Sequence, residues 1–192
     1  KGVVKNIVPA VDGIFVDIGI GKNAFLRRKD LLNEKRFPTE GSPILAQVIK
    51  SDTDMKGALI TEKISMFGKY AVTLSGTGYI GVSKKIRQES VRKRLKEIGK
   101  EICAEHMGLI IRTTAENADM DEFRKDITRL KENWDIIQKR FRMEKSPTLL
   151  YRESDIIVKA LRDYVNKGME ILITDNRKIC LLYTSPSPRD TR

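Results

Sequence analysis

The sequence predicts a mixed α+β protein, with a small β-barrel in residues 1–62 and an α/β region of alternating strands and helices in the residues that follow. Two observations lead to this prediction. Short apolar stretches separated by Gly, Asp and Pro fill the first third of the chain, a pattern typical of a barrel of short strands. Farther along, helical periodicity alternates with short apolar segments, as it does in α/β units.

Composition narrows the class of protein. The 192 residues include 37 Lys and Arg against 26 Asp and Glu, and the net charge of +11 favours a polyanionic partner, nucleic acid ahead of a membrane surface. No apolar run reaches about 20 residues, the length of a membrane span, and 40% hydrophobic residues are too many for a fully disordered chain. Cys103 and Cys180 lie far apart, so we expect reduced thiols in a cytoplasmic protein, not a disulfide scaffold or a cysteine zinc site.

The strands of the first part follow from short alternating segments. A strand-like pattern begins at Val3, and further strands are expected at residues 13–19, 23–26 and 43–50. Two more candidates, residues 69–74 and 79–82, are joined by the glycine-rich turn 75–78.

Two helices are predicted in the second part. The first, over residues 86–106, is strongly basic, and its few apolar residues form one narrow stripe of Val91, Leu95, Ile98 and Ile102. After a short strand at 108–113, the second helix begins at the N-cap Asp119 with Glu122 as capping-box partner, and Pro147 closes it. Its apolar residues recur every three or four positions: Phe123, Ile127, Leu130, Trp134, Ile137 and Phe141.

The remaining residues predict one more α/β unit and a tail. We expect a strand at 148–151, a helix from Ser154 to Gly168 and a strand at 170–174. Residues 181–192 change composition sharply and resemble translated adapter sequence, with a natural flexible tail as the alternative. The first residue is Lys1 instead of methionine, and a strand-like pattern follows at once. Together with the change in the tail, this leads us to expect a chain cut at both ends and no signal peptide.

Two aromatic residues in neighbouring strands are candidates for binding nucleic acid. If Phe15 and Phe25 project from the same face, their rings offer stacking platforms for unpaired bases, worth roughly 1–3 kcal/mol per base. Lys22 and Lys56 lie in loops where they can meet phosphates. The alternative is that both rings belong to the hydrophobic core.

A second candidate site lies at the end of the strand 108–113. Arg112 can bind a terminal phosphate through two parallel hydrogen bonds, and Thr113 adds a hydroxyl. Lys84 and Lys85 can add charge. The alternative is an ordinary pair of surface residues.

The residues predict no catalytic machinery of their own. The single histidine, His106, is interpreted as solvated or helix-terminal and has no Ser-His-Asp set, and Gly76-Thr77-Gly78 lacks the Lys-Ser/Thr of a phosphate-binding loop. Asp175 alone does not make a two-carboxylate magnesium site, and Asp52 and Asp54 are interpreted as turn residues.

The ordered succession of motifs resembles the ribonuclease E/G family from about residue 2 to about residue 180. The matching segments are residues 2–9, 14–19, 22–26, 56–61, 64–65, 68–70, 81–86 and 108–113, the helix of Trp134, and residues 149–151 and 171–175. The resemblance implies an S1-type OB-fold RNA-binding domain over 1–62, a 5′-monophosphate sensor region over 63–147 and a partial ribonuclease-H-like region over 148–180, with 181–192 an unstructured tail.

The resemblance also implies roles for particular residues. Phe15, Phe25 and Lys56 match positions that hold single-stranded RNA. Arg112 and Thr113 match the pair that binds the 5′ monophosphate, and Gly68 and Val72 match positions near the terminal nucleotide. Lys84 stands where arginine is usual, which keeps the charge but loses the planar fork, so weaker sensing is expected.

The function expected from the resemblance is that of a single-strand-specific endoribonuclease that processes ribosomal and transfer RNA and starts messenger decay. The family is magnesium-dependent, and its catalytic carboxylates and its zinc link between subunits are expected beyond residue 192. We therefore expect this chain to be an inactive fragment of a cytoplasmic, homo-oligomeric enzyme. The alternative is a non-catalytic S1-type RNA-binding module, such as a ribosome-associated factor. A weaker one is that the basic helix binds an anionic membrane.

Overall fold

The computed structural model describes residues 1–103 and 107–153. Contacts divide the chain into two units, Lys1–Arg152 and Glu153–Arg192, and the described residues belong almost entirely to the first. The predictions for His106, Asp175 and Cys180, for the helix from Ser154 and for the tail 181–192 lie outside the described residues. The predicted boundaries at 62/63 and 147/148 stay predictions.

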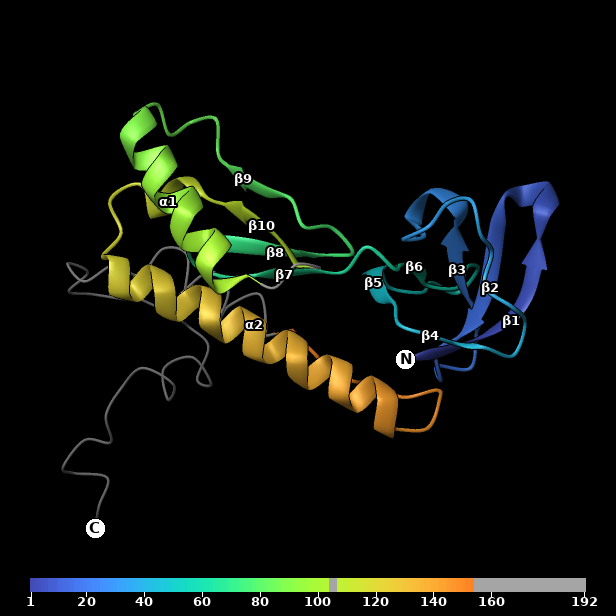
Figure 1. The fold of residues 1–192 in the computed structure, drawn as a ribbon. Coiled ribbons are helices and arrows are strands. Elements are labelled where there is room, and N and C mark those ends of the chain that lie inside the picture. Colours follow the sequence, from blue (N-terminus) through green and yellow to red (C-terminus); the bar gives the residue numbers. More distant parts are fainter. Residues whose placement is uncertain (104–106, 154–192) are drawn as a thin grey trace, which may run out of the picture. The chain divides into compact units, whose positions relative to one another are not determined.

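The first third of the chain forms a curled six-stranded sheet, a half-barrel, as the β-rich pattern predicted (Figure 1). Its strands lie in the order β4-β1-β2-β3-β6-β5. All neighbours are antiparallel except β3 and β6, which run parallel. The bounds are β1 (Gly2–Val8), β2 (Gly13–Asp17), β3 (Ala24–Arg27), β4 (Pro43–Ile44), β5 (Gln47–Lys50) and β6 (Leu59–Thr61).

The single strand predicted at residues 43–50 is wrong. Residues 45 and 46 interrupt it, so that β4 pairs with β1 at one edge of the sheet while β5 pairs with β6 at the other. The curl of the sheet allows one short segment to serve both edges, and a pattern read along the chain contains no information about which strand is the partner.

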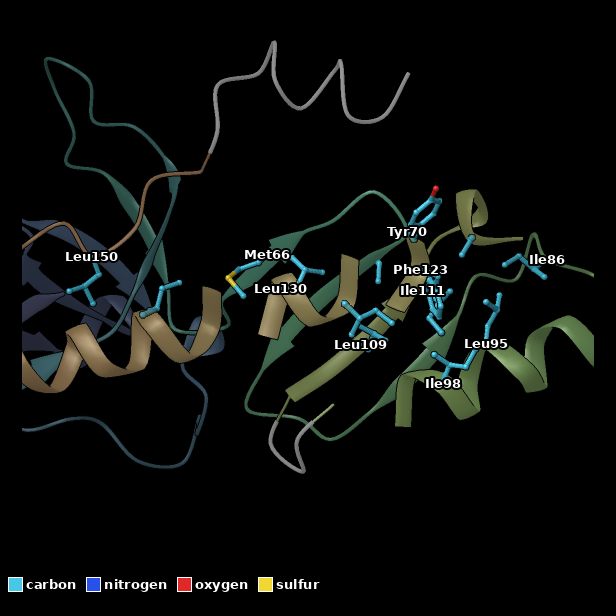
Figure 2. Close-up of a cluster of buried hydrophobic side chains, with 14 residues drawn as sticks. Met66, Tyr70, Ile86, Leu95, Ile98, Leu109, Ile111, Phe123, Leu130 and Leu150 are labelled. Carbon is cyan, nitrogen blue, oxygen red and sulfur yellow. The ribbon is translucent and has the colours of Figure 1, made fainter. Parts of the chain in front are cut away.

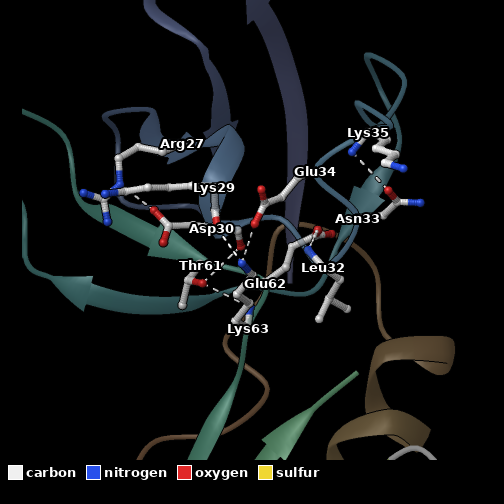
Figure 3. A network of polar contacts seen from close by, with 10 residues as sticks. All are labelled: Arg27, Lys29, Asp30, Leu32, Asn33, Glu34, Lys35, Thr61, Glu62 and Lys63. Atoms are coloured by element: carbon white, nitrogen blue, oxygen red, sulfur yellow. Dashed lines mark hydrogen bonds and ion pairs between the residues drawn. The ribbon is translucent and has the colours of Figure 1, made fainter. Parts of the chain in front are cut away.

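Alternation along the strands separates the two faces of this sheet. One face forms a closed apolar core of Val4, Ile14, Val16, Ala24, Leu26, Leu31, Ile44, Ala58 and Ile60. A polar network holds the segment after β3 against the end of β6 (Figure 3). There the Glu62 N–H donates to the Asp30 carbonyl at 2.9 Å, and the Lys63 ammonium bonds the Lys29 carbonyl and the Glu34 carboxylate. These bonds fix the loop that follows β3.

The second sheet has four strands in the order β7-β8-β10-β9. They are β7 (Ser65–Phe67), β8 (Ala71–Ser75), β9 (Ile80–Val82) and β10 (Met107–Ile111). The prediction of a strand over 69–74 is correct only in part, because Lys69 and Tyr70 lie in the turn between β7 and β8, and β7 was not predicted. Parallel β9 and β10 are joined through a helix, while the other neighbours in this sheet are antiparallel, so the described residues form a mixed α+β fold.

Two helices pack on one face of this sheet, and their spacing patterns are confirmed. They are α1 (Glu89–Ile102) and α2 (Met120–Met143). Asp119 caps α2 by accepting from the N–H groups of Asp121 and Glu122. Figure 2 shows the shared core, to which α1 contributes Leu95 and Ile98 and α2 contributes Phe123 and Leu130. Neither described helix is apolar enough over its length to cross a membrane.

The predicted strand at residues 148–151 is wrong. Leu150 is buried, so the apolar signal in this segment is genuine, but its backbone has other partners. Thr148 exchanges two hydrogen bonds with Lys1, at 3.0 and 2.8 Å, and the Arg140 guanidinium donates to the carbonyls of Leu149 and Leu150. Among the described residues, the segment is an extended stretch held by side chains and by the first residue of the chain.

Candidate nucleic-acid interface

Phe15 and Phe25 lie together on the face of the half-barrel that points away from its core. They are direct cross-strand neighbours on β2 and β3, and their ring centroids are 5.4 Å apart with the planes tilted by 49°. The residues beside them, such as Ile14 and Leu26, point inward and are fully buried, whereas both phenylalanines are half-buried. Both rings therefore project from the same face, outside the buried core of this sheet, and their role in binding nucleic acid stays a prediction.

Small and apolar neighbours shape a groove around the two rings. A Cβ on Gly13 would lie 2.3 Å from the Phe25 ring, so only glycine leaves room for that ring to lie flat over β2. Leu59 pairs with Phe25 from the other side, and Val11 and Met55 continue the apolar lining. The groove has a volume of about 610 Å³, and its lining is mainly apolar with polar groups at the rim. This shape suits stacked bases with an exposed backbone.

Lysines at the rim of this groove differ in their roles. Lys56 and Lys50 are exposed and line the groove, and no described residue bonds either ammonium group. Lys22, by contrast, donates to the carbonyls of Thr53 and Asp54 at 3.0 and 2.9 Å. These two bonds fix the loop that carries Lys56, and the phosphate contact of Lys22 stays a prediction.

The second group of predicted residues meets at one end of the four-stranded sheet. Because β9 and β10 are parallel, their C-terminal ends lie at the same edge, with Val82 opposite Ile111. The Ser83 N–H donates to the Ile111 carbonyl at 2.8 Å, so that the exposed Lys84 follows beside Arg112. The turn of Gly68 reaches the same edge, because Ala71 pairs with Ile111.

Arg112 is held by the turn between β7 and β8. Its Nη1 donates to the carbonyl of Gly68 at 2.9 Å and to that of Lys69 at 3.3 Å. Its backbone N–H donates to the Tyr70 carbonyl at 2.8 Å. Thr114 adds a hydroxyl bond to the Lys69 carbonyl at 2.6 Å. These contacts fix the orientation of a planar group whose fork of N–H donors matches phosphate oxygens.

The turn itself is organised by a buried carboxylate on α2. Asp126 is only 7% exposed, and it accepts the Tyr70 N–H at 2.9 Å and an Arg129 N–H at 2.8 Å. A Cβ on Gly68 would lie 2.3 Å from the Asp126 carboxylate, so this position requires glycine. The Tyr70 hydroxyl donates to Glu122 on the same helix at 2.7 Å. Asp126 and Gly68 together determine where the carbonyls that hold Arg112 lie.

Val72 and Thr113 complete the predicted set. Val72 lies on the sheet face away from the helices, between its cross-strand neighbours Phe67 and Ile110, which are 43% and 39% exposed. Thr113 is exposed and begins a 3₁₀ turn, Thr113–Ala115. The structure therefore brings Gly68, Lys84, Arg112 and Thr113 to one edge of the sheet, with Val72 on the adjoining face.

The described residues do not fit a magnesium or zinc site. They contain no group of three or more His, Cys, Asp or Glu side chains that could hold a metal ion. Burial raises the pKa of the Cys103 thiol, which keeps that sulfur protonated and unlike a metal ligand or a nucleophile.

Four residues of these sites were not predicted from the sequence. Gly13 lies within a strand, where a glycine indicates that another group approaches the backbone closely. Asp126 lies on the apolar face of its helix beside Ile127, where a charged residue is unusual. Lys50, the last residue of β5, and Met55, in the loop that follows, carry no such signal, because only the folded chain brings them to the groove.

Comparisons with known proteins find similar sequences among ribonucleases. The model of the Ribonuclease E/G family matches residues 65–185. Ribonuclease G of Escherichia coli K12 is 32% identical over 92% of this chain and 40% of its own length. Ribonuclease E of Synechocystis sp. is 33% identical over 91% of this chain and 27% of its own length. Ribonuclease E of Buchnera aphidicola (subsp. Schizaphis graminum) is 31% identical over 93% of this chain and 20% of its own length. The chain thus spans about two fifths or less of the length of these relatives.

Proposed function

The chain belongs to the ribonuclease E/G family, and on this premise we propose that it is the RNA-binding and 5′-end-sensing part of a single-strand-specific endoribonuclease. The observation that carries the proposal is the pair of half-buried rings of Phe15 and Phe25 on the outer face of the half-barrel, with Lys56 at the rim of their groove. Accessible aromatic rings with a nearby cation suit unpaired bases on a phosphate chain. We assign this face to an S1-type OB-fold domain.

The edge of the second sheet supplies the 5′-end sensor in this proposal. A terminal monophosphate carries more charge than an internal phosphodiester, and charge-assisted bonds from a guanidinium fork favour it. Arg112 provides the fork, Thr113 a hydroxyl and Lys84 a further cation, while Gly68 and Val72 lie beside the terminal nucleotide. Lys84 acts as a point charge without bidentate geometry, so its contribution falls below that of an arginine.

Cleavage is proposed for the longer enzyme of which this chain matches a part. Its magnesium-dependent chemistry, its roles in rRNA and tRNA processing and mRNA decay, its homo-oligomeric state and its cytoplasmic location stay predictions. The described residues do not fit the metal, so we derive no step of the reaction from them. Their proposed work is to hold the RNA strand and to distinguish its 5′ end.

The proposal is tested by measuring binding of one short single-stranded RNA carrying either a 5′ monophosphate or a 5′ hydroxyl, by fluorescence anisotropy. Arg112→Ala should remove the preference for the monophosphate, with a loss on the order of 1.5–3 kcal/mol, because a charged hydrogen-bond partner is removed. Arg124→Ala is the matched control, since that arginine is exposed and paired with Glu101 on α1.

Phe15→Ala should weaken binding of both RNAs equally, by roughly 1–3 kcal/mol. Tyr79→Ala is its control, because this aromatic side chain is exposed but outside the groove. If Phe15→Ala weakens binding while Arg112→Ala leaves the ratio of the two affinities unchanged, the chain is an S1-type RNA-binding module without a sensor. Unchanged binding in the Phe15 variant would remove the basis of the proposal.

A further inference from the structure

The helix α1 and the turn before it carry a strongly charged surface, of which the proposed sensor uses only Lys84. We call it the basic face, and it comprises the exposed cationic side chains Lys84, Lys85, Arg87, Lys93, Arg94, Lys96 and Lys100. It begins beside Arg112, because Ser83 is bonded to the end of β10. From there it follows α1 away from the sensor edge.

These cations have no partners within the described part of the chain. No hydrogen bond or ion pair joins any of the seven charged groups to another described residue. Two of the three acidic residues of α1 are already engaged, since Glu89 pairs with Arg92 and Glu101 with Arg124. Glu97 is the remaining carboxylate, so the basic face keeps a large excess of positive charge that repels itself unless an anion binds.

The geometry of α1 places three of these charges in a row. Lys93, Lys96 and Lys100 follow the spacing i, i+3, i+7 and share one side of the helix, at rises of about 4.5 and 6 Å. The helix is fixed beneath them, because Leu95 and Ile98 are buried in the core of the second sheet. Arg92 also bonds the carbonyls of Ser83 and Ile86, which ties the turn of Lys84 to α1.

We propose that the basic face binds the phosphate backbone of single-stranded RNA as a third contact, separate from the Phe15 groove and from Arg112. Because its ligand is RNA, this inference rests on the proposed function. An anionic membrane fits the observations less well, since an interfacial helix must insert an apolar face. The apolar stripe of α1 is already packed against the sheet, with Val91 and Ile102 partly buried on it. Only charge is presented outward, and a flexible chain of phosphates complements it.

The experiment measures how the affinity of the full chain for a 3′-labelled oligouridine depends on salt, between about 50 and 200 mM. The variant Lys93→Gln, Lys96→Gln, Lys100→Gln removes three charges and keeps good helix formers. If all three lysines neutralise phosphates, the slope of log K against log salt should fall by about 2, and the affinity should drop on the order of 10- to 50-fold at ~0.15 M salt. The same lysines changed to arginine should restore both.

A matched control separates local contacts from net charge. The variant Lys35→Gln, Lys125→Gln, Lys145→Gln removes the same charge from three exposed, scattered lysines. Its slope should stay close to that of the unmodified chain, because salt screens charges beyond about 10 Å. Equal effects of the two triple variants would overturn the inference, since net charge alone would then explain binding.

The remaining outcomes distinguish the inference from the proposed function. If the chain binds RNA and Phe15→Ala weakens it, but the α1 variant changes nothing, only the inference fails. If the unmodified chain binds no RNA, the proposed function fails with it. A further experiment measures binding to vesicles of anionic phosphatidylserine and of neutral phosphatidylcholine. If the unmodified chain binds the anionic vesicles and the α1 variant does not, while the RNA affinity of the variant is unchanged, the basic face binds a membrane instead. Circular dichroism confirms that each variant keeps its helices.

Discussion

Replacing Asp126 by alanine tests how the turn between β7 and β8 positions Arg112. The carboxylate accepts the buried Tyr70 N–H at 2.9 Å, and the carbonyls of the two residues before Tyr70 hold the Arg112 guanidinium. Without the carboxylate, the turn loses its backbone hydrogen bond to α2. We therefore expect Asp126→Ala to lower both the stability of the chain and its selectivity for a 5′ monophosphate.

The size of the stability loss follows from the two bonds that disappear. A buried N–H left without an acceptor costs about 1–3 kcal/mol. The ion pair adds at most about 1 kcal/mol, because the side chain of Arg129 is 54% exposed and water screens it. The free energy of unfolding should thus fall by about 1–4 kcal/mol, a substantial part of the about 5–15 kcal/mol typical of a whole protein.

The assay combines urea denaturation with the anisotropy titration of 5′-monophosphate and 5′-hydroxyl RNA. Loss of one charged hydrogen bond in the sensor corresponds to roughly a tenfold fall in the ratio of the two affinities. Asp126→Asn keeps an acceptor for Tyr70 and should retain most of the ratio, and Arg129→Gln should leave it unchanged. A folded Asp126→Ala protein with the full monophosphate preference would refute the reasoning.

A double-mutant cycle tests the contact beneath the turn directly. Gly68→Ala places a Cβ 2.3 Å from the Asp126 carboxylate and 2.9 Å from the Ala71 carbonyl. In the Asp126→Ala background the first clash is absent, so Gly68→Ala should cost less there than in the unmodified chain. Additive effects of the two substitutions would show that the close contact does not govern this position.

Three further predictions concern other parts of the molecule. Gly13→Ala should displace the Phe25 ring and weaken RNA binding in anisotropy titrations, while melting shows a folded chain; unchanged affinity would contradict the shape of the groove. Burial raises the pKa of the Glu62 carboxyl above its ordinary value of 4.5. The neutral carboxyl therefore stabilises the fold below pH 4.5, and this contribution is lost as the pH rises through the raised pKa. Glu62→Gln, which can still accept the Leu32 N–H, should therefore gain stability relative to the unmodified chain between about pH 4 and 7 in urea titrations, and a pH-independent difference would contradict this cause. Asp119→Ala should cost about 1 kcal/mol in the same assay through loss of the α2 N-cap, and an unchanged midpoint would show that the cap is dispensable.

Features that repeat along the chain were predicted well. The positions of α1 and α2 and the cap at Asp119 follow from spacing between near neighbours. Predictions that depended on a partner were less successful. The strands expected at 43–50 and 148–151 are apolar enough, but the first divides between two edges of a sheet and the second bonds to Lys1 and Arg140.

By itself, the sequence determined the classes of segment, the excess of positive charge and the identity of the two candidate sites, because periodicity and composition are local properties. Only the tertiary structure decided how those residues are used. Arg112 meets Gly68 across 44 positions and Asp126 meets Tyr70 across 56. Such pairings arise when separate strands and helices pack, and their hydrogen bonds depend on geometry that no pattern of neighbouring residues specifies. The same packing decided that Lys22 supports a loop while Lys56 faces the groove.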